Sequence, residues 1–433
     1  MTQLAKALVI RGKQPLQGSI SVNTAKNSAL FLMLGSLLTR EEVVLRDIPR
    51  LSDILIMAEM LEHFGAQVSW IGNDLHICAA DIINTNGPYH LVSKMRASFV
   101  AIGALLGRCG KASIAMPGGC TFGPRPVDRH IKAFRALGVV IDEEDGDFNA
   151  HLPKPLSGIY EFEAPTVGGT ENVLLASALG AETVVIKNAA LEPEIIDLAA
   201  MLNQMGARIS GAGTRTITIE GVAELKGVTY RPISDRIEAA TLLLAVAATR
   251  SEAVLTGVQV DLLTSALNKL REAGVVTEDL GGGKLRVDAR GELKPISVTA
   301  TEYPGIPTDV QAPFGAFLAT VTGESQVEER VYPGHRFTHV EELAKMGADI
   351  SLDDSCLTIQ GQNLRGAKVQ AADIRAGGAL IIAALAAEGT SVITGVEFIE
   401  RGYENIAARL RALGADIHEE EILDVPQTGT YGD

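Results

Sequence analysis

One short pattern, the end of an apolar helix followed by a glycine and then a short strand, occurs six times along this chain. The copies read MLEHFGAQV, AFRALGVVI, MLNQMGARI, KLREAGVVT, ELAKMGADI and RLRALGADI, and their glycines are Gly65, Gly138, Gly206, Gly274, Gly347 and Gly414. Successive glycines are 67 to 73 residues apart. The chain is therefore expected to fold as six copies of one structural repeat.

The first copy shows what the second half of each repeat should look like. Apolar residues recur at steps of three and four before Gly65, which predicts an amphipathic outer helix that ends at this glycine; they are Ile54, Met57, Leu61 and Phe64. Alternating apolar residues then flank a turn at 72–74, which predicts a β-hairpin. The turns DGD at 145–147 and GGG at 281–283 hold the same position in later copies.

The first half of each repeat contains a helix that is apolar nearly all round, and such a helix must be buried. The six helices read AKNSALFLMLGSLL, MRASFVAIGALLG, GGTENVLLASALG, DRIEAATLLLAVAA, TDVQAPFGAFLAT and DIRAGGALIIAALA. Each repeat thus runs strand, buried helix, strand, outer helix, hairpin. The prediction is an α/β fold in which buried helices pack together with sheets outside them, and six repeats suffice for two domains of three.

Four of these buried helices open with a cation: Lys26, Arg96, Arg236 and Arg375. Helix N-termini attract anions through free N–H groups and the helix dipole. If two domains face each other with these ends inward, the cleft between them would suit a phosphorylated, carboxylated substrate. An alternative interpretation stays open for two of them: Arg236 and Arg375 could form structural salt bridges with Asp235, Glu238 and Asp373.

Composition restricts the classes of partner. The net charge is −15 and the pI is near 5.1, so no global basic field exists for nucleic acid or an anionic membrane surface. The N-terminus lacks the apolar core of a signal peptide, and the longest apolar helix, near 376–387, is too short to span a bilayer. Four cysteines with no CxxC or Cys/His metal spacing predict reduced thiols, a cytoplasmic protein and no bound metal.

The stretch MPGGCTFGPRPVDRH, residues 116–130, places Cys120 among glycines, prolines and cationic side chains. Cationic neighbours favour the thiolate and attract anions, which predicts a reactive loop. The alternative is a tight surface turn with an incidental cysteine. Cys78, Cys109 and Cys356 are interpreted as small apolar side chains.

Ten motifs together carry a resemblance to a known family. In chain order they are AKNSAL, KMRAS, PGGCTFGPRPVDRH, TVGGTEN, PEIIDLA, DRIEA, PTDVQA, RFTHVEEL, DIRAG and ERGYE. With these motifs the chain resembles the UDP-N-acetylglucosamine enolpyruvyl transferases over roughly residues 10–420. The resemblance implies an inside-out α/β barrel of two domains with three βαβαββ repeats each. It also implies a discontinuous domain of 1–25 with 235–433 and a second domain of 26–234.

The resemblance further implies the reaction: transfer of the enolpyruvyl group of phosphoenolpyruvate to the 3-hydroxyl of UDP-N-acetylglucosamine, with release of phosphate. This is the first committed step of peptidoglycan synthesis, on which cell-wall growth, cell shape and division depend. The methylene carbon of phosphoenolpyruvate must gain a proton and the sugar hydroxyl must lose one. Such chemistry needs an acid, a base and cations around an anionic substrate, and no metal or redox cofactor.

By the same resemblance, Cys120 is the proton donor and the target of fosfomycin, and Asp309 is the base near the sugar hydroxyl. Lys26, Arg125 and Arg401 are the cations that bind phosphoenolpyruvate, together with Asn27 and Cys120. The residues implied to hold the UDP-sugar are Asn27, Arg96, Arg125, Pro126, Val127, His130, Thr166, Val167, Gly168, Asp309 and Val331. Arg336 and Asp373 fall on further active-site positions.

The chain departs from the family pattern at three places. Asn23 and Thr24 replace a small pair beside Lys26, Ser52 stands where some members have lysine, and PGHRF, ending at 337, replaces ENRF. A paralogue that uses another nucleotide or nucleotide sugar as acceptor is therefore one alternative, and a non-catalytic UDP-sugar sensor is another. A shikimate-pathway enolpyruvyl transferase is disfavoured, since that family lacks the cysteine loop.

Overall fold

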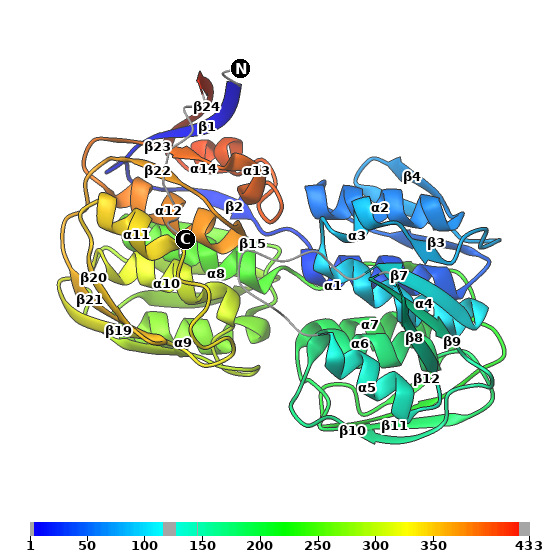
Figure 1. Cartoon of the computed structure of the whole chain (residues 1–433). Helices are drawn as coiled ribbons and strands as arrows, with labels where there is room; N and C mark the ends of the chain where they lie inside the picture. Colours follow the sequence, from blue (N-terminus) through cyan, green and yellow to red (C-terminus); the bar gives the residue numbers. More distant parts are fainter. Residues whose placement is uncertain (1–3, 116–126, 145, 424–433) are drawn as a thin grey trace. The chain divides into compact units, whose positions relative to one another are not determined.

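The computed structural model of the chain describes residues 4–115, 127–144 and 146–423. It divides into two compact units (Figure 1). Unit 1 comprises Met1–Val22, Arg236–Thr301 and Gly305–Asp433, and unit 2 comprises Asn23–Asp235 and Glu302–Pro304. The domain ranges expected from the resemblance, 1–25 with 235–433 and 26–234, differ from these two units by a few residues at their boundaries. These ranges stay a prediction.

Unit 2 contains the first three repeats. The first is built from α1 (Lys26–Gly35), the 3-10 helix η1 (Ser36–Leu38), β3 (Glu42–Leu45), α2 (Ser52–Phe64), β4 (Gln67–Ile71) and β5 (Asp74–Cys78). The second is built from β6 (Asn86–Gly87), α3 (Tyr89–Val92), η2 (Arg96–Val100), α4 (Ala101–Cys109), β7 (Lys111–Ala115), α5 (Asp128–Ala136), β8 (Val140–Glu144) and β9 (Asp147–His151). The third is built from β10 (Gly158–Glu161), α6 (Val167–Ser177), β11 (Thr183–Lys187), α7 (Pro193–Gln204), β12 (Arg208–Ser210) and β13 (Thr216–Glu220).

Unit 1 contains the other three repeats. The fourth is built from α8 (Arg236–Ala248), β15 (Glu252–Thr256), η3 (Val260–Leu263), α9 (Thr264–Glu272), β16 (Val276–Gly281) and β17 (Lys284–Asp288). The fifth is built from β18 (Ser297–Ala300), η4 (Thr308–Val310), α10 (Gln311–Leu318), β19 (Gly323–Glu329), α11 (His339–Lys345), β20 (Asp349–Asp353) and β21 (Cys356–Gly361). The sixth is built from β22 (Lys368–Gln370), α12 (Ile374–Ala386), β23 (Thr390–Thr394), α13 (Val396–Ile399), α14 (Ile406–Ala412) and β24 (Asp416–Leu423).

Each repeat has a four-stranded sheet of the same design. A short edge strand runs parallel to a central strand, and the hairpin strands follow antiparallel. With β1 (Leu4–Arg11), β2 (Ser19–Ser21) and β14 (Val228–Tyr230) included, the orders are β14-β3-β5-β4, β6-β7-β9-β8, β10-β11-β13-β12, β2-β15-β17-β16, β18-β19-β21-β20 and β22-β23-β1-β24. The hairpin predicted after Gly65 is confirmed as β4 and β5.

Two short strands are exchanged between the repeats, which the repeat pattern did not predict. β2 (Ser19–Ser21) precedes α1 but pairs in unit 1, with Ser19 opposite Val254 of β15. β14 (Val228–Tyr230) precedes α8 but pairs in unit 2, with Val228 opposite Val43 of β3. In the sixth sheet β1 (Leu4–Arg11) takes the place of the second hairpin strand, antiparallel to both β23 and β24.

The predicted division into buried and outer helices is confirmed. The buried helices α1, α4 and α6 pack together in unit 2, as α8, α10 and α12 do in unit 1 (Figure 1). All residues of α8 are buried, and the core is aliphatic with few aromatic rings. Each outer helix ends within two residues of a repeat glycine, and the six glycines have φ of 85° to 110°, the left-handed region that a C-terminal glycine adopts without strain. No helix within the described part of the chain is both long and apolar enough to cross a bilayer.

The crossing of α4 and α6 depends on Gly103, and this gives a testable prediction. A Cβ at Gly103 would lie 2.3 Å from the Asn172 carbonyl oxygen. Alanine normally stabilises a helix interior by about 1 kcal/mol relative to glycine. Gly103→Ala is instead expected to lower the free energy of unfolding by about 1–3 kcal/mol, because the backbones must separate.

The control for this change is Gly315→Ala in α10, where the nearest atom to a new Cβ, His339 Nε2, is 3.5 Å away. Ordinary contact at that distance leaves the helix-propensity gain, so this variant should be neutral or more stable. Urea unfolding of both variants measures the difference. Equal stabilisation by the two changes would contradict the packing argument.

Candidate active site

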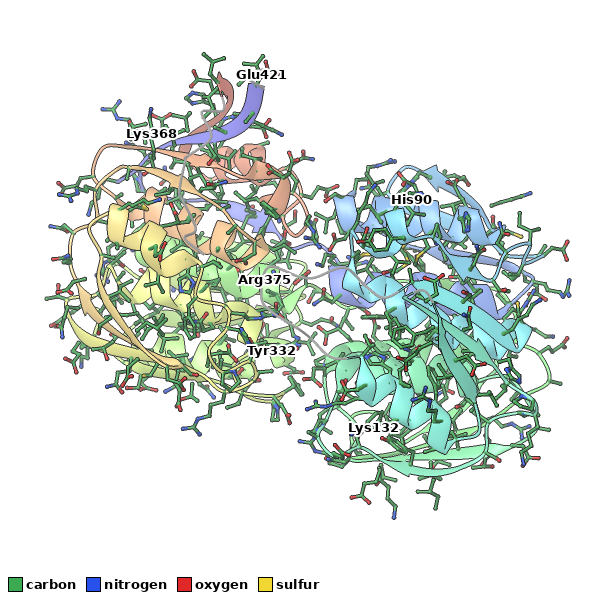
Figure 2. All side chains as sticks on the ribbon, in the orientation of Figure 1. His90, Lys132, Tyr332, Lys368, Arg375 and Glu421 are labelled. Carbon is green, nitrogen blue, oxygen red and sulfur yellow. The ribbon has the colours of Figure 1, made fainter. Side chains whose placement is uncertain are left out.

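A carboxylate held by two arginines lies at the opening of the fifth buried helix, in unit 1. Asp309 belongs to η4, directly before α10, and its Oδ1 accepts hydrogen bonds from Arg336 Nη1 at 2.8 Å and from Arg375 Nε at 2.9 Å. Arg336 precedes α11 and Arg375 lies in the first turn of α12, where Figure 2 labels it. The three side chains are 25%, 11% and 12% exposed. Three segments far apart in the sequence therefore converge on one oxygen.

The arginines keep Asp309 ionised. Burial is the largest single effect on its pKa and raises it, but Arg336 and Arg375 together outweigh burial and hold the pKa well below the usual range. A carboxylate with so low a pKa is a weak proton acceptor in this arrangement. For Asp309 to act as a base, a ligand must alter these guanidinium contacts or compensate them.

Asp373, the second carboxylate of this cluster, holds the helix rather than the arginine side chain. Its Oδ1 accepts the backbone N–H groups of Arg375 and Ala376 at 2.8 and 3.0 Å, and Thr338 Oγ1 donates to its Oδ2 at 2.5 Å. This is an N-cap of α12. The Arg375 guanidinium thus pairs with Asp309, which was not among the partners considered for it, while Asp373, which was, orients the turn that carries Arg375.

Glu329, which the sequence analysis did not single out, holds the backbone next to Asp309 and Arg336 in place. It is 1% exposed and accepts hydrogen bonds from Thr308 Oγ1 at 2.7 Å, Val331 N at 2.7 Å and Tyr332 N at 2.9 Å. It thereby ties the residue before Asp309 to the turn that leads to Arg336. That turn contains the PGHRF departure, and Arg336 still reaches Asp309, with its Cζ 4.9 Å from the centre of the Tyr332 ring. Tyr332 is labelled in Figure 2.

The remaining expected cation of unit 1, Arg401, follows α13 in a half-buried position. Its neighbour Gly402 lies against the first turn of α12, since a Cβ at Gly402 would be 2.4 Å from Ile374 Cγ2. The segment that carries Arg401 thus contacts the helix that carries Arg375.

In unit 2, Lys26 begins α1 and forms a buried ion pair. Its Nζ donates to Asp53 Oδ2 at 3.0 Å, and the two side chains are 8% and 3% exposed. Its backbone N donates to Asp235 Oδ2 at 3.1 Å. Asp53 follows Ser52 at the start of α2 and was not singled out in the sequence. An anion that binds the Lys26 ammonium must share it with Asp53. Asn27, next in α1, is half-buried.

A second buried carboxylate, Asp197 of α7, fastens the chain before α8 to α1. It accepts hydrogen bonds from Ser28 Oγ, from the Tyr230 hydroxyl at 2.6 Å and from Ile233 N at 3.2 Å. Burial raises the pKa of Asp197, although these hydrogen bonds act against the rise. The sequence offered no signal for this residue, because its partners come from distant segments.

Five of the eleven residues expected to hold the UDP-sugar lie where α5 and α6 begin. Asn172 Oδ1 accepts the Gly103 N–H at 2.8 Å, so its Nδ2 is the donor to His130 Nδ1, also at 2.8 Å. The neutral His130 ring therefore carries its proton on Nε2. A Cβ at Gly168 would lie 3.0 Å from His130 Cε1, so glycine lets the ring approach the helix end.

Three further expected residues complete this group. Thr166 caps α6 by accepting the Gly169 N–H at 3.3 Å, and His130 N bonds to the Val127 carbonyl at 3.0 Å. Val127 and Val167 are half-buried beside them. The structure thus brings Val127, His130, Thr166, Val167 and Gly168 together in unit 2.

Several expected residues cannot be placed in this way. Cys120, Arg125 and Pro126 lie outside the described residues, as does the side chain of Arg96, whose backbone begins η2. Val331 is half-buried in unit 1. Within the described residues, no group of three or more His, Cys, Asp or Glu side chains could hold a metal ion.

Glu171 of α6 gives a pH-dependent prediction. It is fully buried, and its carboxyl oxygens have no hydrogen-bond partner among the described residues. Burial raises its pKa well above the usual value, and the carboxylates of Glu194 and Glu192 raise it further. The folded protein therefore keeps the proton that the unfolded chain releases near pH 4, so stability is lost as pH rises from there toward the folded pKa.

Glu171→Gln replaces the carboxyl group by an amide of nearly the same shape that does not titrate. The variant should match the native chain near pH 4 and exceed it at higher pH, by up to about 1.4 kcal/mol per pH unit until the folded pKa is reached. Urea unfolding between pH 4 and pH 8 measures this trend. Glu182→Gln, an exposed change in the same unit, is the control. The same trend in both variants would show that burial of Glu171 is not the cause.

Comparison with known proteins identifies the family. The family model described as EPSP synthase (3-phosphoshikimate 1-carboxyvinyltransferase) matches residues 10–410. The UDP-N-acetylglucosamine 1-carboxyvinyltransferase of Thermus thermophilus is 51% identical over 418 residues, covering 96% of this chain and 98% of that protein. The protein of the same name from Deinococcus radiodurans is 49% identical over 417 residues, covering 96% of this chain and 97% of that protein.

Solved structures show the same fold at lower identity. The enolpyruvyl transferase NikO from Streptomyces tendae matches with a TM-score of 0.87 and 23% identity, covering 97% of this chain and all of that one, 100%. An EPSP synthase from Acinetobacter baumannii matches with a TM-score of 0.74 and 17% identity, covering 96% and 100%. The inside-out α/β fold is thus confirmed. The chain belongs to the EPSP synthase family of enolpyruvyl transferases, in the group of the UDP-N-acetylglucosamine 1-carboxyvinyltransferases.

Proposed function

We propose that this chain is the enzyme that transfers the enolpyruvyl group of phosphoenolpyruvate to the 3-hydroxyl of UDP-N-acetylglucosamine and releases phosphate. The observation that carries the proposal is the 51% identity over 96% of the chain to a protein named for this activity. The Asp309 cluster supports it, since its carboxylate is ionised and can accept a proton once a ligand alters its contacts with Arg336 and Arg375. The product would enter peptidoglycan synthesis in the cytoplasm.

In the proposed mechanism Asp309 takes the proton of the sugar 3-hydroxyl as its oxygen attacks C2 of phosphoenolpyruvate. Cys120 gives a proton to the methylene carbon, so that a tetrahedral ketal forms. The methyl group then returns a proton, the bond from C2 to the phosphate oxygen breaks, and phosphate leaves. Because the pKa of Asp309 is low, its carboxylate accepts the proton of the 3-hydroxyl only as that hydroxyl becomes more acidic during its attack on C2. Proton transfer to Asp309 is therefore delayed until the attack is under way.

The cations have separate tasks in this proposal. Lys26, Arg125 and Arg401 would bind the phosphate and carboxylate of phosphoenolpyruvate, with Asn27 beside them. The Lys26–Asp53 pair supports this role for Lys26, because the carboxylate of Asp53 holds the Lys26 side chain at the start of α1. The Arg336 and Arg375 pairs with Asp309 would orient the base.

The UDP-sugar would be held by the group around the start of α6, where the His130 Nε2–H is a donor. The proposed set is Asn27, Arg96, Arg125, Pro126, Val127, His130, Thr166, Val167, Gly168, Asp309 and Val331, with Arg336 and Asp373 in support. The proposed partners are the two small-molecule substrates, and the chemistry requires neither a metal nor a redox cofactor.

The test is phosphate release from phosphoenolpyruvate by the purified protein, with UDP-N-acetylglucosamine, UMP or shikimate 3-phosphate as acceptor. Turnover with the UDP-sugar alone is expected. Turnover with UMP alone would favour a paralogue, and turnover with shikimate 3-phosphate would favour the activity in the family model's description. Binding of the UDP-sugar without any turnover would favour a sensor.

Asp309→Asn tests the role of the base. The amide keeps the size of the side chain but cannot accept the hydroxyl proton, so kcat should fall by about 10²–10⁴-fold while UDP-N-acetylglucosamine still binds. The matched control is Asp288→Asn, which removes a carboxylate from a surface cluster with Arg286 and Arg290. The control should keep kcat, and full activity of Asp309→Asn would remove Asp309 from the mechanism.

A further inference from the structure

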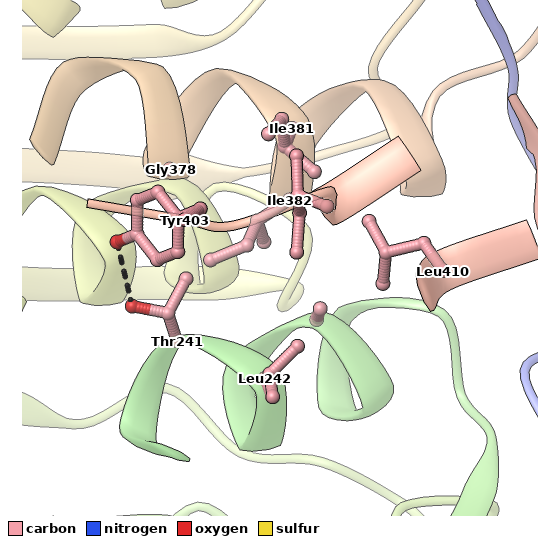
Figure 3. A pocket seen from close by; sticks show the side chains of 9 residues that line it. Thr241, Leu242, Gly378, Ile381, Ile382, Tyr403 and Leu410 are labelled. Carbon is pink, nitrogen blue, oxygen red and sulfur yellow. Dashed lines mark hydrogen bonds between the residues drawn. The ribbon is translucent and has the colours of Figure 1, made fainter. Parts of the chain in front are cut away.

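Tyr403 is a buried tyrosine two residues after Arg401, and neither the motifs nor the mechanism gives it a task. It is 1% exposed, and its hydroxyl lies 3.0 Å from Thr241 Oγ1 of α8, as Figure 3 shows. Thr241 donates its own proton to the Ile237 carbonyl at 2.9 Å. The Tyr403 hydroxyl must therefore be the donor to Thr241.

Tyr403 lines a small apolar cavity within unit 1. Its walls come from α8, α12 and α14, and the lining residues beside Tyr403 and Thr241 are Leu242, Ala245, Gly378, Ile381, Ile382, Ile406 and Leu410. Figure 3 shows Leu410 at the end of the cavity away from the hydroxyl. The hydrogen bond to Thr241 is thus a polar anchor at one end of an apolar site.

Three glycines let the segment 399–403 lie directly on the first turns of α12. A Cβ at Gly378 would be 2.6 Å from the Tyr403 hydroxyl oxygen, and one at Gly377 would be 2.5 Å from Ile399 Cγ1. From the other side, a Cβ at Gly402 would be 2.4 Å from Ile374 Cγ2. A larger residue at any of these three points would require the contacting side chain, Tyr403, Ile399 or Ile374, or the backbone that carries it, to move.

The same first turn of α12 also determines where Asp309 is held. Arg375 donates from this turn to Asp309, and Asp373 caps it. Behind Arg401, the backbone N–H groups of Gly402 and Tyr403 both bond to the Ile399 carbonyl, each at 3.0 Å. The first turn of α12 therefore carries Arg375, the partner of Asp309, and also contacts the segment that carries Arg401.

We propose that Tyr403 is a positioning residue for the enolpyruvyl transfer. Anchored by Thr241 and seated on Gly378, it fixes the segment of Arg401 against α12, so that the Arg401 guanidinium keeps a set position relative to Arg375 and Asp309. This inference rests on the proposed function of Arg401 in binding phosphoenolpyruvate. Catalysis depends steeply on such placement, since a misplacement of about 1 Å can cost about 10²-fold.

Two variants test the anchor. Tyr403→Phe removes the hydroxyl and keeps the ring, and loss of a hydrogen bond worth about 1 kcal/mol should raise the KM for phosphoenolpyruvate about fivefold. Gly378→Ala pushes against the hydroxyl and should raise this KM at least as much. The KM for UDP-N-acetylglucosamine should stay unchanged in both. Leu410→Ala is the matched control: it should destabilise the same cavity without changing either KM.

A double-mutant cycle shows whether Tyr403 acts through Arg401. In an Arg401→Lys background, Tyr403→Phe should change phosphoenolpyruvate affinity much less than in the native chain. Equal fold-changes in the two backgrounds, or a KM shift in Leu410→Ala as large as in Tyr403→Phe, would overturn the proposal.

Calorimetric titration of phosphoenolpyruvate in the presence of UDP-N-acetylglucosamine gives the same comparison without turnover. Phosphate release by the native chain tests the proposed function separately. If the native chain turns over while Tyr403→Phe and Gly378→Ala bind phosphoenolpyruvate normally, the positioning role is wrong and the function stands. If the native chain does not turn over but these variants weaken phosphoenolpyruvate binding through Arg401, the positioning role stands and the function fails.

Discussion

Unit 1 depends on keeping the charge of Asp309 inside the protein. A buried carboxylate without partners costs several kcal/mol, and removal of one member of a buried pair leaves that cost uncompensated. Arg336 and Arg375 provide the compensation from two distant segments. The cap on α12, the turn held by Glu329 and the glycine contacts of Arg401's segment all serve to keep these groups in place. The requirement for a paired charge therefore accounts for much of the local structure.

In unit 2 the buried charge is positive, and it too is paired with a charge of opposite sign. Lys26 is buried, and its ammonium is paired with the buried carboxylate of Asp53. In both units the charged group proposed to act in the reaction, Asp309 or Lys26, already forms an ion pair with another side chain. The proposed substrates must therefore compete with these ion pairs or join them. Glu171 shows what happens to a buried carboxyl that has no hydrogen-bond partner among the described residues: burial raises its pKa, which favours the protonated form.

The repeated fold could be predicted well from the sequence. The glycines after the outer helices, the apolar helices and the hairpin at 72–74 are local signals, and the structure has the expected element at each. The repeat pattern alone did not predict the exchange of β2 and β14, because it identifies the elements of each repeat and not the sheet that each short strand joins; only the domain ranges implied by the resemblance placed 1–25 with 235–433. Of the site, Asp309 and Lys26 were predicted through a resemblance in their motifs. Asp53, the partner of Lys26, was missed, and so was Glu329, which holds the turn that leads to Arg336, because the sequence around a carboxylate does not indicate which distant group it will contact.

By itself the sequence determined six repeats, their buried and outer helices, and the chemical groups available for a reaction. These follow from periodicity and backbone preference over a few residues, which act wherever the chain lies. Only the tertiary structure decided which charges are paired, which tautomer His130 adopts, and how Tyr403 joins Arg401's segment to α12. Those outcomes depend on distances between residues far apart in the chain, and the electrostatic energies that follow from them exist only after burial has removed water.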